Sequence, residues 1–143
     1  MILRSWQESD LPQIEKIEQE SFSDPWPLDA FRPVLRFPVL YGILAEDGGQ
    51  VLGYACTQVV FEEMELQNIA VAPWARGKGV GAALLAAVEE NAKSRGAEYG
   101  FLEVRVSNAP AISLYQKFGY QQIGVRKNYY PDGEDAIVMK KDL

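Results

Sequence analysis

The residues best suited to chemistry lie in a glycine-rich segment that reads Pro73-Trp74-Ala75-Arg76-Gly77-Lys78-Gly79-Val80-Gly81-Ala82. Because glycine has no Cβ, such a backbone can press against an anion and direct successive N–H groups at it. A helix predicted to begin at Val80 adds its positive end, and Arg76 and Lys78 add full charges. The segment therefore predicts a localised phosphate-binding site.

Two phosphate ligands fit the spacing of this segment. Gly77-x-Gly79-x-x-Ala82 matches a dinucleotide fingerprint, but that motif needs its first glycine at the end of a strand, and here the four residues 73–76 intervene. Arg76-x-x-Gly79-x-Gly81 instead matches the pyrophosphate loop of acetyl-CoA-dependent N-acetyltransferases. A glycine-rich turn that binds no ligand is the structural alternative.

Proton transfer in this chain must use carboxylates, tyrosine, lysine, the chain terminus or one cysteine, because the sequence has no histidine. This absence excludes Ser-His and Cys-His nucleophile pairs and histidine-ligated zinc. A single cysteine excludes an internal disulfide framework and a metal site made of cysteines alone, so we expect no metal. Cys56 lies mid-strand with no histidine to activate it, which disfavours a covalent route through its sulfur.

Glu103 and Tyr115 are the two candidate proton carriers. Glu103 is predicted to face away from the apolar neighbours on its strand, and its ordinary alternative is a solvated glutamate or a salt bridge to Arg105 or Lys78. Tyr115 belongs to an apolar stripe at helical spacing, where a buried core tyrosine is the ordinary alternative. Asn108 precedes that helix and is a good N-cap residue.

Hydrophobic periodicity and turn residues predict the elements that must position these residues. Alternating apolar residues predict strands at 1–6, 39–46, 50–61, 64–72, 99–106, 120–130 and 135–142. Helical spacing predicts helices after an N-cap at Ser9, at 28–36 with Pro33 disturbing its second half, at 80–95 and at 108–118. Hairpins at both ends and helical crossovers between them imply a mixed sheet with helices on both faces.

The strand at 64–72 has an alternation that slips. Its large apolar residues first occupy even positions, Met64 and Leu66, and then odd positions, Ile69 and Val71. One extra residue near Gln67-Asn68, a β-bulge, would restore all four to one face and turn backbone groups out of the ladder. A strand buried on both faces is the alternative, since alternation then carries no information.

The composition excludes several classes of protein. The 143 residues are 48% hydrophobic and 24% charged, which is ordinary globular usage and predicts one compact domain. Twenty acidic against 14 basic residues give a net charge of −6, which argues against a nucleic-acid partner. The start of the chain lacks a signal-peptide pattern and no apolar run is long enough to span a membrane, so we expect a cytoplasmic protein without a membrane partner.

With a strand before the glycine segment and a helix after it, the chain resembles the Gcn5-related N-acetyltransferase (GNAT) superfamily over nearly its whole length. Four further segments resemble the bacterial members that acetylate the N-terminal alanine of a small-subunit ribosomal protein: Asn68-Ile69-Ala70-Val71, Leu102-Glu103-Val104-Arg105, Ser107-Asn108-x-x-Ala111-Ile112-x-Leu114-Tyr115 and Arg126-x-Asn128-Tyr129-Tyr130-Pro131. The resemblance implies one GNAT domain over residues 1–143. It implies an α/β (mixed α+β) fold whose mixed, mostly antiparallel sheet carries a β-bulge in the fourth strand.

The resemblance also implies a role for each candidate residue. Glu103 would be the general base and Tyr115 the acid that protonates the CoA sulfur, with the N–H of Val71 as oxyanion donor. Acetyl-CoA would be held by Ile69, Ala70, Val71, Arg76, Gly77, Lys78, Gly79, Val80, Gly81, Ala82 and Asn108. Two loops, one with Pro25 and Trp26 and the other with Tyr129 and Tyr130, would hold the first residues of the substrate. An aromatic pair that merely shields the sheet is the alternative for the two tyrosines.

Three functions remain open from the sequence. The first is direct acetyl transfer from acetyl-CoA to a protein N-terminus, a ribosomal protein being the implied partner. The second is a related acetyltransferase that acts on lysine or a small amine. The third is a CoA-binding regulatory module without turnover, against which the presence of both Glu103 and Tyr115 counts.

Overall fold

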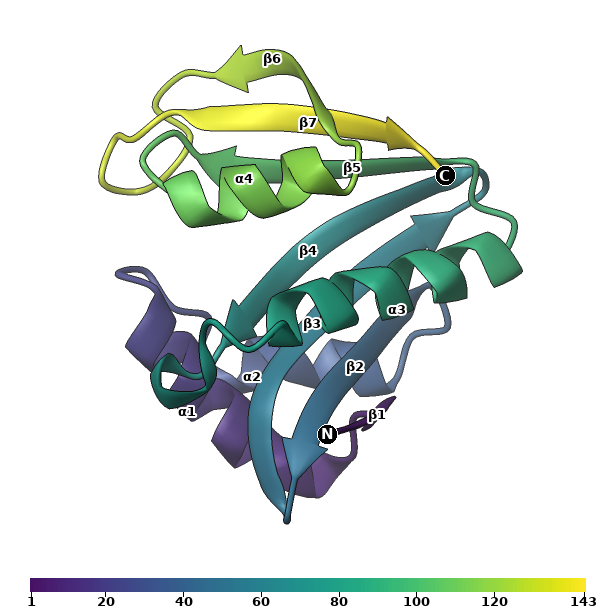
Figure 1. Cartoon of the computed structure of the whole chain (residues 1–143), viewed down its shortest axis with the longest axis vertical. Coiled ribbons are helices and arrows are strands. Elements are labelled where there is room, and N and C mark those ends of the chain that lie inside the picture. Colours follow the sequence, from purple (N-terminus) through teal and green to yellow (C-terminus); the bar gives the residue numbers. More distant parts are fainter.

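The computed structural model describes residues 1–143 and places seven strands in one sheet, in the order β1-β2-β3-β4-β5-β7-β6 (Figure 1). The strands are β1 (Ile2–Ser5), β2 (Leu40–Asp47), β3 (Gln50–Val60), β4 (Glu63–Val71), β5 (Tyr99–Arg105), β6 (Gln121–Arg126) and β7 (Ala136–Asp142). Every neighbouring pair is antiparallel except β4 with β5. The predicted mixed, mostly antiparallel sheet is therefore confirmed.

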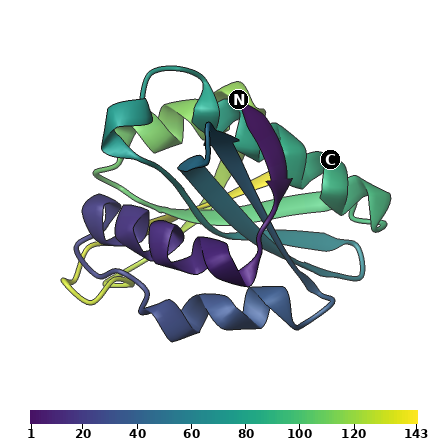
Figure 2. The same ribbon diagram turned by 90° about the horizontal axis from the view of Figure 1, so that it is seen from below.

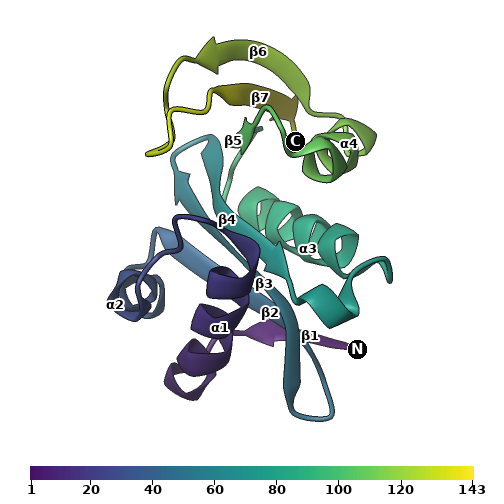
Figure 3. The same cartoon turned by 90° about the vertical axis from the view of Figure 1, so that its left-hand side faces the viewer.

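Helices cover both faces of the sheet, as predicted (Figures 2 and 3). They are α1 (Leu11–Ser21), α2 (Leu28–Phe31), α3 (Val80–Ser94) and α4 (Ala109–Lys117). Apolar residues of α1 and α2 pack with Leu44 and Tyr54 on one face, while those of α3 pack with Ile43 and Ala55 on the other. None of these helices is both long and apolar enough to cross a membrane.

Several predicted boundaries are wrong for local reasons. Ser9 is not an N-cap, because it lies inside a 3₁₀ turn, Glu8–Asp10, in which the Asp10 carboxylate accepts the N–H of Gln7 at 2.7 Å. The helix expected at 28–36 becomes α2 followed by the 3₁₀ turn Arg32–Leu35, since Pro33 cannot donate an N–H to an α-helical ladder.

The β5 and β6 strands are shorter than expected. Val106, predicted to share a face with Leu102 and Val104, lies beyond the end of β5 and is 45% exposed. The strand expected at 120–130 ends at Arg126, because Asn128 takes a left-handed conformation with φ 52° and its N–H is accepted by the Asp135 side chain.

The predicted bulge is present in β4. Cys56 of β3 lies opposite Asn68 and Thr57 opposite Leu66, so Gln67 is the extra residue. Leu66 packs in the apolar cluster on the α3 face, and Ile69 and Val71 pack against that same cluster after the bulge. One inserted residue therefore restores the slipped alternation to a single face.

The bulge coincides with the point at which β4 and β5 separate. The parallel pairing joins only Glu63–Glu65 to Tyr99–Phe101, and the two strands then diverge (Figures 1 and 3). The N–H of Ala72 donates to Leu52 of β3 at 2.8 Å, so by antiparallel alternation Ile69 and Val71 direct their N–H and C=O groups toward the divergence. Beyond Glu65, the side of β4 that faces β5 therefore pairs with no strand, and we call this side at residues 69–71 the open edge of β4.

Candidate active site

The carboxylate of Glu103 lies at this divergence, on the face of β5 opposite the buried Leu102 and Val104. Its Oε1 is 3.4 Å from Nε of Arg126, whereas its Oε2 is buried and has no hydrogen-bond partner. A buried oxygen without a partner is costly in a folded protein, and this atom has its capacity to accept a hydrogen bond unused. The partner of Glu103 is Arg126, not the Arg105 or Lys78 considered from the sequence.

Glu103 lines a pocket of about 220 Å³ at the junction of β3, β4, β5 and the β6–β7 hairpin. The residues that share this lining are Gln58, Val60, Glu63, Glu65, Phe101, Leu102, Arg126 and Val138. The Tyr129 hydroxyl also lies beside Glu103, and this contact is the largest cause that raises the pKa of Tyr129 above its ordinary value. The carboxylate therefore has a phenol, a guanidinium and a pocket around it.

Tyr115, the second candidate, is buried in α4 with its ring edge-on to that of Tyr120, the centroids 6.0 Å apart. Burial raises the pKa of Tyr115, and the nearby phenol of Tyr130 raises it further. A raised pKa keeps the phenol protonated near neutral pH, which is the state an acid requires. Tyr115 is therefore a core residue, and its role as an acid stays a prediction.

The glycine segment forms a turn that runs into α3. Gly77 and Gly79 have φ of 76° and 82°, a left-handed conformation in which a side chain is strained. No backbone acceptor takes the N–H groups of residues 77–82, whereas Ala83 already donates to Gly79 at 3.0 Å. The result is a run of free N–H donors at the positive end of a helix, as an anion site requires.

Arg76 and Asn108 each have an intramolecular partner. Nε of Arg76 donates to the carbonyl of Val71 at 3.1 Å, and its Nη2 donates to Ser21 Oγ at 3.3 Å, which joins the glycine turn to β4 and α1. Asn108 accepts the N–H of Ala111 at 3.3 Å, so it is the N-cap of α4. Lys78 is exposed and supplies charge alone.

The structure reduces the number of β4 residues whose backbone can bind the cofactor as predicted. Ile69 and Val71 direct backbone groups toward the divergence, while Ala70 has its N–H on the β3 side and its side chain in the core beside α1. Of the three residues expected to pair with an extended ligand, two are therefore oriented to do so.

The two loops predicted to border the site are joined by Arg105. Its guanidinium contacts Asp24 of the α1–α2 loop at 2.9 Å, and Asp132 and Glu134 of the β6–β7 loop at 2.8 Å each. The same group lies 4.1 Å from the ring centre of Tyr130. The β6–β7 loop accordingly lies beside the α1–α2 loop (Figure 2). Sequence reasoning missed this role, for which the only local signal is that Arg105 follows Glu103 at a spacing of two.

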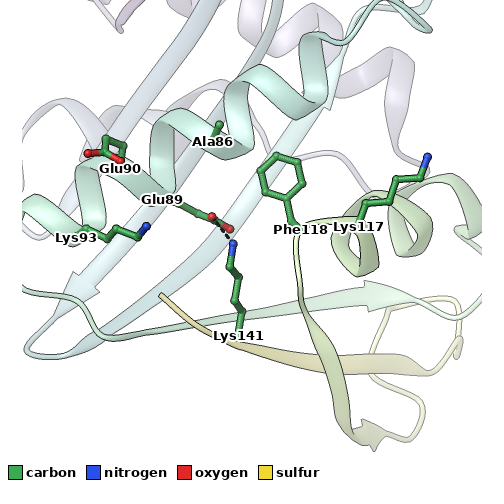
Figure 4. Close-up of a pocket in the computed structure, with 7 residues that line it drawn as sticks. All are labelled: Ala86, Glu89, Glu90, Lys93, Lys117, Phe118 and Lys141. Atoms are coloured by element: carbon green, nitrogen blue, oxygen red, sulfur yellow. Dashed lines mark hydrogen bonds and ion pairs between the residues drawn. The ribbon is translucent and has the colours of Figure 1, made fainter.

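A second pocket, of about 380 Å³, lies between α3, the end of α4 and β7 (Figure 4). One pair of its charges is satisfied, since Glu89 accepts from Lys141 Nζ at 2.7 Å and from the Tyr120 hydroxyl at 2.9 Å. It contains none of the predicted site residues, and its paired ions join β7 to α3. We therefore assign it a structural role.

Comparison with known proteins agrees with this geometry. The model of the GNAT acetyltransferase family matches residues 11–120. The chain belongs to the GNAT acetyltransferase family. It is 40% identical over 140 residues to the [ribosomal protein bS18]-alanine N-acetyltransferase of Escherichia coli strain K12, covering 96% of this chain and 94% of that protein.

Solved GNAT structures superpose on nearly the whole chain. The ribosomal-protein-S18-alanine N-acetyltransferase from Escherichia coli has a TM-score of 0.90 at 38% identity, covering 99% of this chain and 92% of that one. Naa20 from Chaetomium thermophilum, in complex with a bisubstrate analogue, has a TM-score of 0.88 at 26% identity, covering 100% and 87%. The chain is therefore similar to N-acetyltransferases in both sequence and fold.

GNAT acetyltransferases use acetyl-CoA, and the chemistry of this site fits that molecule. The free N–H groups of residues 77–82 suit a pyrophosphate. The open edge suits an amide-bearing arm through the N–H of Val71 and the C=O of Ile69, since the N–H of Ile69 is bound by Asn68 and the C=O of Val71 by Arg76.

Proposed function

We propose that this protein transfers the acetyl group of acetyl-CoA to the N-terminal α-amine of a protein whose first residue is alanine, with a small-subunit ribosomal protein as substrate. The observation that carries the proposal is the partnerless Oε2 of Glu103, placed where β4 and β5 separate. The names of relatives at 40% identity support the substrate class.

Glu103 would accept the proton that the amine must lose. An α-amino group titrates near ~8, so at neutral pH it is largely protonated and unreactive. Oε2 of Glu103, which has no hydrogen-bond partner, can take that proton directly or through one water. Acetyl-CoA supplies the activated acetyl group, and this chain's contribution is to remove the proton next to it.

Two further groups complete the proposed chemistry. The N–H of Val71, on the open edge of β4, would donate to the acetyl oxygen as negative charge develops there. The phenol of Tyr115, kept protonated by burial, would supply the proton for the departing sulfur. Both groups lie on elements that pack in one apolar cluster with α3.

The two bordering loops are assigned to the protein substrate. Trp26 lies on one loop and Tyr129 and Tyr130 on the other, and Arg105 ties the loops together. The ion pairs hold both loops beside the site, and the proposal takes these loops to contact the first residues of a protein substrate.

A thiol-release assay with a panel of amines tests the proposal. We expect turnover with peptides that begin with alanine, and none with the same peptides when the N-terminus is blocked and an internal lysine is free. Turnover with lysine or small amines alone would overturn the assignment in favour of another acetyltransferase. Binding of CoA without turnover on any amine would leave only a regulatory module.

A further inference from the structure

Glu18 is a buried charge that the proposed reaction does not use. It continues the apolar stripe of α1 formed by Leu11, Ile14 and Ile17, so its side chain points at the sheet, and the residue is 1% exposed. No lysine or arginine pairs with it. A buried carboxylate without a cation is costly and persists only where hydrogen bonds satisfy it.

Three donors from three separate segments satisfy this carboxylate. Oε1 of Glu18 accepts from the hydroxyl of Tyr54 on β3 and from Nδ2 of Asn68 on β4, the latter at 2.6 Å. Oε2 accepts the backbone N–H of Trp26 at 2.9 Å. Because Pro25 and Pro27 have no N–H, this is the only backbone donor in the Pro-Trp-Pro sequence of the α1–α2 loop.

Two of these donors belong to opposite sides of the candidate site. Asn68 directly follows the bulge residue Gln67, and its Oδ1 accepts the N–H of Ile69 at 3.0 Å, so it fixes the start of the open edge. Trp26 lies on the loop proposed to contact the substrate and packs on Phe31 with ring centres 5.3 Å apart. One carboxylate thus binds the substrate loop and the cofactor strand at once.

We propose that Glu18 is a positioning residue that couples the substrate loop to the bulged strand, so that each is ordered in its productive place only while the other is. The inference rests on the proposed function, because it assigns Trp26 to the amine side and Ile69 to the acetyl-CoA side. Glu18 touches neither substrate and acts through Trp26 and Asn68.

The coupling has a simple physical cause. If the loop withdraws the N–H of Trp26, Oε2 loses its only donor, and the carboxylate must rotate or attract water. Either movement weakens its hydrogen bond to Asn68. The side-chain amide of Asn68 donates through Nδ2 to Glu18 and accepts the N–H of Ile69 at Oδ1, so the change reaches Ile69. Disorder on one side therefore spreads to the other through a single side chain.

Glu18→Gln tests the coupling without a change of volume. The Gln oxygen can keep both donors of Oε1, Tyr54 and Asn68, while its NH₂ faces the N–H of Trp26, where no hydrogen bond can form. We expect the KM for an alanine-first peptide to rise about tenfold and the KM for acetyl-CoA to rise by a smaller factor, about threefold, because the loss at Trp26 reaches Ile69 only through Asn68. Amide hydrogen exchange at Trp26, followed by NMR, should accelerate by at least about tenfold.

Asn68→Ala tests the other side of the link. We expect it to raise the KM for acetyl-CoA and also to accelerate amide exchange at Trp26, which it does not touch. In the double variant Glu18→Gln/Asn68→Ala, the loss in kcat/KM should be smaller than the product of the two single losses by about threefold or more. If Glu18→Gln fails to fold, amide exchange at Trp26 in the Asn68→Ala variant still tests the proposal. An exchange rate equal to that of the wild type would overturn it.

Tyr54→Phe is the matched control, since it removes the third hydrogen bond to Glu18 and leaves Trp26 and Asn68 in place. We expect a lower melting temperature with both KM values within about twofold of wild type. The proposal is wrong if Glu18→Gln behaves in the same way, or if Glu18→Gln raises the KM for the peptide and leaves the KM for acetyl-CoA at the wild-type value. A wild-type protein that acetylates no alanine-first peptide refutes the proposed function instead, and the exchange measurements still report on the link.

Discussion

Two charged residues on one face of β5 are used in opposite ways. Glu103 and Arg105 both point away from the α3 face, because side chains two apart on a strand share a side. Arg105 is saturated by three carboxylates, and those contacts raise its pKa above its already high ordinary value. Glu103 keeps one oxygen without a partner. The saturated residue holds structure, and the unsatisfied one is free for chemistry.

Glu103→Gln should show whether Glu103 acts in the reaction or only in the structure of the site. The amide keeps the shape of the side chain but cannot accept the amine proton, so we expect kcat to fall by about 10²-fold or more. The KM for acetyl-CoA should stay unchanged, because the N–H groups of residues 77–82 are untouched. Steady-state kinetics on an alanine-first peptide measure both values.

Glu98→Gln provides the control, since Glu98 is an exposed glutamate just before the same strand. Its kinetics should match those of the wild type. Equal turnover in Glu103→Gln and wild type would remove Glu103 from the mechanism and leave Oε2 as a structural defect.

At the level of elements, the site is a junction of loops held by strands. The α1–α2 and β6–β7 loops are far apart in sequence, yet Arg105 at the end of β5 contacts both. The β6–β7 loop is also ordered internally, since Tyr130 donates its N–H to the carbonyl of Glu134 at 3.1 Å. The mouth of the site is therefore set by a few specific ion pairs rather than by apolar packing.

Arg105→Lys should loosen that mouth while keeping the charge. An ammonium group lacks the planar fork that reaches several carboxylates at once, so at least one loop is released. We expect the KM for the peptide to rise about tenfold, with a smaller change in the KM for acetyl-CoA. Titrations with each substrate in turn provide the measurement.

Lys127→Gln is the matched control, since it breaks an exposed ion pair to Asp135 in the same hairpin. Such a pair contributes little, so both KM values should stay near wild type. A peptide KM that is unchanged in Arg105→Lys would show that the loops are held without the guanidinium.

Most helices and strands could be predicted from local sequence patterns, whereas the long-range contacts between side chains could not. The bulge at Gln67 follows from a slipped alternation that only an extra residue can correct. The partners of Arg105 and Glu18 lie eight to 81 residues away, and no local pattern encodes such pairings. Ser9 failed as an N-cap because the nearby Asp10 carboxylate is used by Gln7 and Arg4, a tertiary contact that overrides local preference.

At the level of the whole molecule, the first strand and helix are tied to β2 by a partly buried cluster of charges. Arg4 on β1 makes two hydrogen bonds to Asp10, each 2.8 Å, and a third to Glu46 on β2 at 3.0 Å. Since α1 carries Glu18 and packs against β3 and β4, this cluster holds one wall of the site in register with the rest. Global stability and the geometry of the site therefore share an anchor.

Asp10 should make stability depend on pH in the acid range. Its hydrogen bonds with Arg4 lower the pKa of its carboxyl below the ordinary value of 3.8, and the N–H of Gln7 lowers it further. The unfolded chain then binds a proton more readily than the folded one, so the stabilisation is fully present above about pH 4 and disappears as the pH falls through the folded pKa. Urea unfolding at pH 7 and at pH 3 measures the effect.

Asp10→Asn should lower the free energy of unfolding by about 2 kcal/mol at pH 7, because it removes charge-assisted bonds from a nearly buried site. The gap between wild type and variant should shrink toward pH 3, because the Asp10 carboxyl of the unfolded wild-type chain takes up a proton more readily than that of the folded chain. Asp142→Asn, at an exposed position on β7, should follow the wild type at both pH values. A gap that stayed constant with pH would place the stabilisation in packing rather than in charge.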